Sequence, residues 1–104
     1  LWRICENAYQ GEGGTTWIHY FGTTPMSDPS IYVPCQYPST RRIEAGDVVF
    51  TEISASFWEY PGQVLRTFTV AADPTPLYRD LYATAEAALA AVLAQVRAGA
   101  TMQA

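Results

Sequence analysis

The sequence of 104 residues has no lysine, a single histidine and only two cysteines. Ten acidic residues outnumber six arginines and give a net charge of −4, so the composition provides no basic surface to displace counterions from a nucleic acid. No apolar run is long enough to span a membrane, and no charged-then-apolar leader opens the chain. We therefore expect a cytoplasmic protein that binds neither nucleic acid nor membrane, with Cys5 and Cys35 as reduced thiols.

Hydrophobic residues make up 49% of the sequence and charged residues 15%, which is the balance of a globular protein. The length fits one small domain over residues 1–104. The first residue is leucine rather than methionine, and the pattern starts as if inside a helix. We therefore expect this sequence to be a fragment of a longer protein.

The first half of the chain predicts a helix, a strand and a long loop. Leu1, Ile4 and Ala8 recur at helical spacing over residues 1–10, and the glycines at 11, 13 and 14 end that helix. Residues 15–22 are aromatic and β-branched, which favours a strand. Residues 23–42 are expected to form a loop because they contain Pro25, Pro29, Pro34 and Pro38.

The second half predicts a hairpin and a long helix. Residues 48–57 and 63–70 alternate as strands, and with Trp58-Glu59 as the turn, Glu52 and Gln63 become diagonal neighbours on one face. A helix begins at Pro76 with Thr75 as its cap and is expected to end at Gly99. The fold class is therefore α+β, an antiparallel sheet with one long helix packed on it.

Residues 46–68 read GDVVFTEISASFWEYPGQVLRTF. A Gly-Asp pair opens the strand, Glu52 and Gln63 stand eleven residues apart, and Arg-Thr-Phe ends the segment. This arrangement resembles the pita-bread hydrolases, which include creatinase, prolidase, aminopeptidase P and methionine aminopeptidase. In that family two metal-binding aspartates occupy the places of Glu52 and Gln63, and a substrate-contacting histidine follows a proline where Pro34-Cys35 stands here.

The resemblance spans almost the whole sequence and implies the first of two pseudo-symmetric halves of a catalytic domain, the second of which supplies a histidine and two glutamates. It implies hydrolysis of C–N bonds, as in Xaa-Pro peptides or creatine. Glu52 is longer than aspartate and Gln63 is neutral, so we expect no metal pair and no other cofactor. The candidate catalytic residues are Glu52 and Cys35, and the candidate substrate-binding residues are His19, Gln63, Arg66, Trp58 and Tyr60.

Each candidate also has a plainer interpretation. Glu52 is either an acid, base or cation-binding group or a buried carboxylate bonded to Gln63. Cys35 is either an inert thiol or a nucleophile with His19 as its base. Arg66 pairs with Glu52, Glu59 or a substrate carboxylate.

Two functions follow from these interpretations. The first is a metal-independent hydrolase of a small molecule or short peptide, in the manner of creatinase or an Xaa-Pro peptidase. The alternative is an inactive pseudoenzyme or half-domain that binds a small ligand or self-associates. The expected partner is either a second copy in a homodimer or the remainder of the same catalytic domain.

Overall fold

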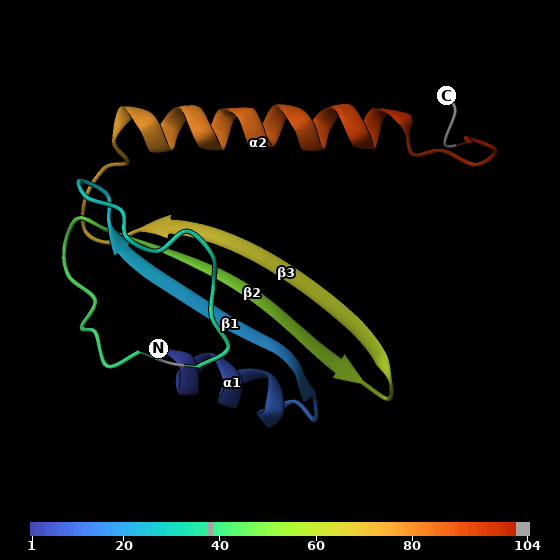
Figure 1. Cartoon of the computed structure of the whole chain (residues 1–104). Coiled ribbons are helices and arrows are strands. Elements are labelled where there is room, and N and C mark those ends of the chain that lie inside the picture. Colours follow the sequence, from blue (N-terminus) through green and yellow to red (C-terminus); the bar gives the residue numbers. More distant parts are fainter. Residues whose placement is uncertain (38, 102–104) are drawn as a thin grey trace. The chain divides into compact units, whose positions relative to one another are not determined.

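The computed structural model describes residues 1–37 and 39–101, so Pro38 of the predicted loop lies outside the described residues. The elements follow the predicted order (Figure 1): α1 (Trp2–Gly11), β1 (Thr15–Pro25), β2 (Asp47–Phe57), β3 (Tyr60–Thr69) and α2 (Pro76–Gln95). The three strands form one antiparallel sheet in the order β1-β2-β3. The predicted α+β class is confirmed.

The chain consists of two compact units, Leu1–Asp73 and Pro74–Ala104. The first unit contains α1 and the whole sheet, and the second contains α2. That residues 1–104 form a single domain and that the long helix packs on the sheet stay predictions.

Helix α1 ends where the glycines predicted it would. The N–H of Gly13 donates to Gln10 O at 3.0 Å and the N–H of Gly14 donates to Tyr9 O at 2.9 Å, which is a Schellman motif. Gly13 has a φ of +84°, and a Cβ at Gly14 would lie 2.9 Å from Tyr9 O. Both positions therefore require glycine.

Helix α1 contacts the sheet through Trp2 and Tyr9. Ile4 is 73% exposed, whereas Trp2 and Tyr9 are partly buried and hydrogen-bond to His19 of β1. The helix that the spacing of Leu1, Ile4 and Ala8 predicts is formed. Its hydrogen bonds to the sheet come from the aromatic residues Trp2 and Tyr9 and not from this aliphatic set.

Strand β1 is longer than predicted because Thr23, Thr24 and Pro25 continue the ladder with β2. The ladder is irregular near its start, where the register shifts between Thr16 and Ile18 and Trp17 has no partner on β2. Trp17 is therefore the extra residue of a β-bulge.

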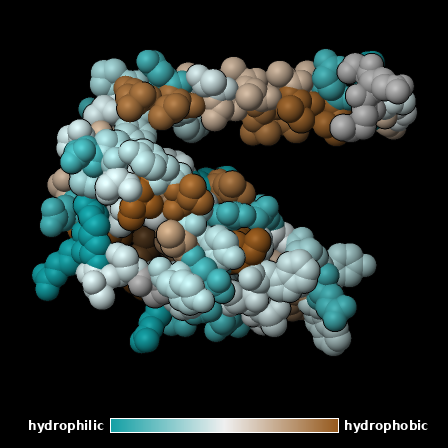
Figure 2. All heavy atoms as spheres, viewed as in Figure 1, coloured by the Kyte–Doolittle hydropathy of each residue, from teal (hydrophilic) through white to brown (hydrophobic). Residues whose placement is uncertain are grey.

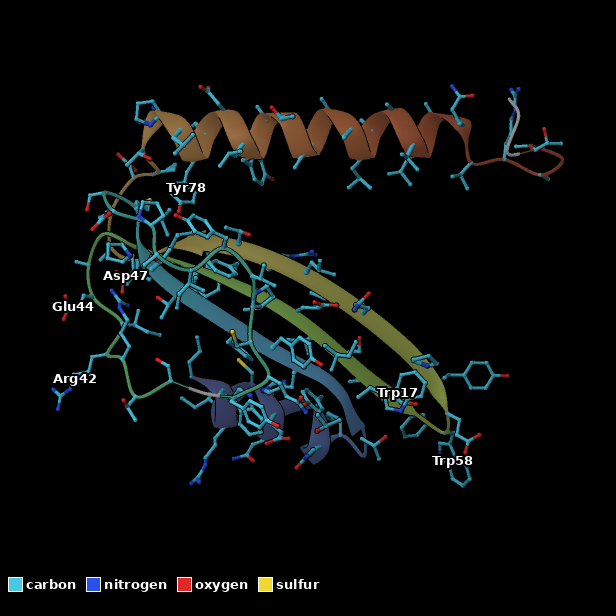
Figure 3. The ribbon with its side chains drawn as sticks, in the orientation of Figure 1. Trp17, Arg42, Glu44, Asp47, Trp58 and Tyr78 are labelled. Carbon is cyan, nitrogen blue, oxygen red and sulfur yellow. The ribbon has the colours of Figure 1, made fainter. Side chains whose placement is uncertain are left out.

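Strands β2 and β3 form the predicted hairpin, and β3 starts at Tyr60 rather than Gln63 because the turn has only two residues. Both turn residues have positive φ, 48° for Trp58 and 64° for Glu59. Trp17 and Trp58 lie at the same end of the sheet, and Asp47 lies at the other (Figure 3).

The register assigns the strand side chains to two faces, because direct partners in an antiparallel ladder project to the same side. One face carries the row Tyr20, Glu52 and Leu65, and the other carries the neighbouring row Phe21, Thr51 and Arg66. We call these the Glu52 face and the Thr51 face. Helix α1 contacts His19, which lies on the Thr51 face.

Helix α2 begins at Pro76 as predicted and carries apolar side chains along much of its length (Figure 2). Thr75 occupies the N-cap position, but its hydroxyl makes no capping hydrogen bond. The predicted end at Gly99 is wrong: Val96 is already extended, and Gly99 has a φ of +82° in a separate turn. Within the described part of the chain, neither helix has the length and hydropathy needed to span a bilayer.

Candidate functional site

The carboxylate of Glu52 and the amide of Gln63 meet on the Glu52 face. Gln63 lies opposite Ser54, one diagonal step from Glu52, and its Nε2 donates to Glu52 Oε1 at 2.9 Å. The predicted contact across the hairpin is confirmed. The predicted burial is wrong, because Glu52 is only half-buried and Gln63 is exposed.

These two side chains do not fit a pair of divalent metal ions. A two-metal centre requires several negatively charged oxygen ligands, whereas this pair offers one carboxylate and one neutral carbonyl oxygen. Gln63 also directs its N–H donor at the carboxylate. Across residues 1–37 and 39–101, no three His, Cys, Asp or Glu side chains gather in a way that could hold a metal ion.

Cys35 lies beyond the edge of β1, opposite Phe21. The two residues exchange backbone hydrogen bonds of 2.9 and 3.1 Å, so Cys35 extends the row of Phe21 and Thr51. The thiol is exposed, and its Sγ donates to Val33 O at 3.7 Å. Cys35 and Glu52 therefore lie on opposite faces of the sheet.

His19 is 3% exposed, and both of its ring nitrogens have partners. Nε2 lies 2.9 Å from the carbonyl of Trp2, and Nδ1 lies 3.1 Å from the hydroxyl of Tyr9. Because a carbonyl only accepts, Nε2 carries a proton and donates it to the carbonyl of Trp2. His19 thus holds α1 on the sheet, and the predicted pairing with Cys35 is not formed.

The contacts of His19 continue along α1 as a hydrogen-bond network. The hydroxyl of Tyr9 lies 3.0 Å from Thr16 Oγ1, which donates to Glu6 Oε1 at 3.0 Å and accepts from Gln10 Nε2 at 3.1 Å. Every member belongs to α1 or β1. The network therefore holds α1 on β1.

The remaining predicted substrate-binding residues lie elsewhere. Arg66 is on the Thr51 face and donates from Nη1 to Leu65 O at 2.7 Å. Among the described residues, Arg66 forms no ion pair with Glu52 or Glu59. Trp58 and Tyr60 are at the hairpin tip, where they are 83% and 85% exposed.

An ion pair that the sequence did not predict fixes the loop between β1 and β2. Asp47 is 1% exposed and accepts from Arg41 Nη1 at 2.6 Å and Nη2 at 2.7 Å. It also accepts from the backbone N–H of Glu44 at 2.8 Å. The hydrogen bonds from Arg41 outweigh the effect of burial and lower the pKa of Asp47 to about 2. The same hydrogen bonds raise the pKa of Arg41.

We call this group of contacts the Arg41–Asp47 clamp. The nearest sequence signals are the Gly-Asp step and the arginine pair before it. Neither shows that Asp47 is buried, because that depends on how the loop folds back over the sheet.

The model of metallopeptidase family M24 matches residues 1–104. No curated protein and no solved structure matches the chain. The family match confirms the resemblance to the pita-bread hydrolases, and the sheet with its two helices is consistent with half of a pita-bread fold. The chain therefore belongs to metallopeptidase family M24, a family of peptidase-like hydrolases.

Proposed function

We propose that this chain forms one wall of a creatinase-like or Xaa-Pro peptidase-like hydrolytic site that works without a metal pair. The observation that carries the proposal is the 2.9 Å hydrogen bond from Gln63 Nε2 to Glu52 Oε1. An amide that donates to a carboxylate oxygen holds the carboxylate in one orientation. The pair is accessible from solvent, which a reacting group requires.

In this proposal Glu52 moves the proton that hydrolysis requires. Gln63 holds Oε1 and leaves Oε2 to face the substrate. Glu52 takes a proton from a water molecule as the water oxygen bonds to the substrate carbon. It then gives that proton to the nitrogen as the C–N bond breaks, so its charge is restored at the end of the cycle.

The substrate is a small molecule or short peptide. Tyr20 and Leu65 flank Glu52 in the same row and offer apolar contacts. Cys35, His19 and Arg66 are on the other face, so the hydrolytic step proposed here does not use them. The catalytic role of Cys35, substrate binding by His19, Arg66, Trp58 and Tyr60, and a cytoplasmic location stay predictions.

The test measures hydrolysis of Xaa-Pro dipeptides and of creatine by the intact purified protein, before and after exhaustive chelation. We expect activity to survive chelation. Glu52→Gln should lower kcat/KM by about a hundredfold or more. The matched control, Glu59→Gln, removes a carboxylate from the same hairpin and should leave kcat/KM unchanged.

Loss of activity on chelation with recovery on adding a divalent ion would reject metal independence. A second measurement tests whether the pair of Glu52 and Gln63 evolved from a metal site. The triple variant Glu52→Asp, Gln63→Asp and Cys35→His restores the residues that the family resemblance implies, and we expect it to gain metal affinity. No gain would argue against an origin of this pair from metal-binding aspartates.

A second function is a half-domain without catalysis, which binds a small ligand or a second copy of itself. The observation that favours it is the division of the predicted site residues between two faces and the hairpin tip. Intact mass under native and denaturing conditions tests it. A denatured mass of 11.5 kDa with twice that mass in native solution supports self-association, and a much larger denatured mass supports the hydrolase.

A further inference from the structure

A cavity of about 260 Å³ lies between the start of α1, the strands β1 and β2, and the loop that joins them. Its lining strand residues Phe21 and Val49 belong to the Thr51 face. A molecule in this cavity would be separated from Glu52 and Gln63 by the sheet. The cavity is therefore not part of the proposed hydrolytic site.

Three sets of hydrogen bonds hold the loop over this cavity. Cys35 is bonded to Phe21 through both backbone groups. The N–H of Ser30 donates to the buried hydroxyl of Thr24 at 2.8 Å. The third set is the Arg41–Asp47 clamp. The cavity is thus already shaped in the absence of a ligand, which lowers the entropic cost of binding.

The lining defines the chemistry of the occupant. Trp2 and Phe21 present aromatic rings, and Ile31 and Val49 add aliphatic surface. Arg41 also lines the cavity, but its charge is balanced by Asp47 through two hydrogen bonds of 2.6 and 2.7 Å. A second carboxylate would compete with Asp47 for the same guanidinium. An uncharged group that accepts a hydrogen bond fits better.

We propose that this cavity binds an uncharged molecule with a single aromatic ring and one carbonyl or amide acceptor. The ring lies among Trp2, Phe21 and Val49, and the acceptor faces Arg41. Because the cavity is lined by both α1 and the loop, such a ligand joins two elements that contact different parts of β1. It thereby stabilises the folded Leu1–Asp73 unit.

The test is a titration of the intact protein with benzamide, followed by calorimetry and by the methyl resonances of Ile31, Val49 and Leu65. We expect saturable binding that shifts Ile31 and Val49 but not Leu65. Benzoate, which has the same ring with a negative charge, should bind about tenfold more weakly or worse. Equal or tighter binding of benzoate would overturn the assignment of an uncharged ligand.

Two tryptophan substitutions in the same loop make a matched pair. Cys35→Trp places an indole at the cavity wall and should weaken benzamide binding by about tenfold or more. Val33→Trp introduces the same side chain at an exposed residue outside the lining and should leave binding unchanged. No saturable binding, shifts confined to Leu65, or an equal response of both variants would each reject the proposal.

Discussion

At the residue scale, the most constrained group is the carboxylate of Asp47. It is almost completely buried, and its charge is balanced by Arg41 and by the backbone of Glu44. A buried charge is tolerated only when it is paired and hydrogen-bonded. Asp47 is the first residue of β2, so these contacts fasten the preceding loop to the sheet.

We predict that Asp47→Asn lowers the free energy of unfolding by about 2–3 kcal/mol, because it removes a charged acceptor and leaves Arg41 without its partner. Urea unfolding at neutral pH measures this loss. Asp28→Asn, at an exposed position of the same loop, is the control and should change little. A similar loss in both variants would show that the ion pair is not the cause.

The same carboxylate predicts a pH dependence. The pKa of Asp47 is lowered from 3.8 to about 2 in the folded protein, so its ionisation stabilises the fold above pH 3.8. That contribution is lost as the pH falls from 3.8 through about 2. The difference in unfolding free energy between wild type and Asp47→Asn should therefore shrink over this range. A difference that stays constant down to pH 2 would contradict the assignment.

A second prediction concerns the buried imidazole. His19→Phe keeps an aromatic ring beside Trp2 and Tyr9 but removes both polar contacts. We expect a loss of about 1–3 kcal/mol and faster hydrogen exchange in α1 than in β3. Tyr20→Phe changes the neighbouring strand position on the other face and serves as control. Uniform acceleration in both variants would mean that His19 does not specifically hold α1.

Some of these residue contacts could be predicted from the sequence, and others could not. The contact of Glu52 with Gln63 follows from strand alternation and a two-residue turn, both of which are local. The roles of His19 and Asp47 depend on α1 and on a loop folding back over the sheet. No local pattern around a lone histidine or a Gly-Asp step contains that information.

At the element scale, the β2–β3 turn is unusual for its sequence. Trp58 and Glu59 both adopt positive φ, which a two-residue hairpin turn of this hand requires and which asparagine and glycine tolerate better. The backbone strain of such positions is about 1–3 kcal/mol each. The turn was predictable from the two flanking strands, but its conformation was not.

We predict that replacing Trp58-Glu59 with Asn-Gly raises the free energy of unfolding by about 1–2 kcal/mol. Thermal and urea unfolding measure the gain. The single change Glu59→Gly should supply part of it. If neither variant is more stable than wild type, the positive φ values of Trp58 and Glu59 do not strain the turn by about 1–3 kcal/mol each.

Other element boundaries differ for identifiable reasons. The prolines after residue 22 suggested a loop, yet Pro25 closes β1 because a proline is tolerated at the end of an edge strand. The helix expected to reach Gly99 stops at Gln95, where the β-branched Val96 turns extended. These boundaries depend on which backbone groups find partners.

At the scale of the whole molecule, the hydrogen bonds that hold α1, the sheet and the loop all lie within Leu1–Asp73. We predict that a fragment of residues 1–73 keeps the three-stranded ladder and the buried imidazole of His19. Amide exchange and the His19 ring resonances test this. The peptide 74–104 is the comparison and should be mostly unfolded, because a lone helix of this length is marginal in water. An unfolded 1–73 fragment would show that the first unit depends on the second.

Trp17 determines how much change in length the first strand can accept. As the unpaired residue of the bulge, it can be deleted without altering which face any other residue of β1 occupies. Deleting Tyr20 instead would move His19 into the row of Glu52 and bring Ile18 towards α1. Removal of one residue should therefore be harmless at Trp17 and disruptive at Tyr20, so the tolerance of this strand depends on whether the deleted residue has a partner on β2 and not on how many residues are removed.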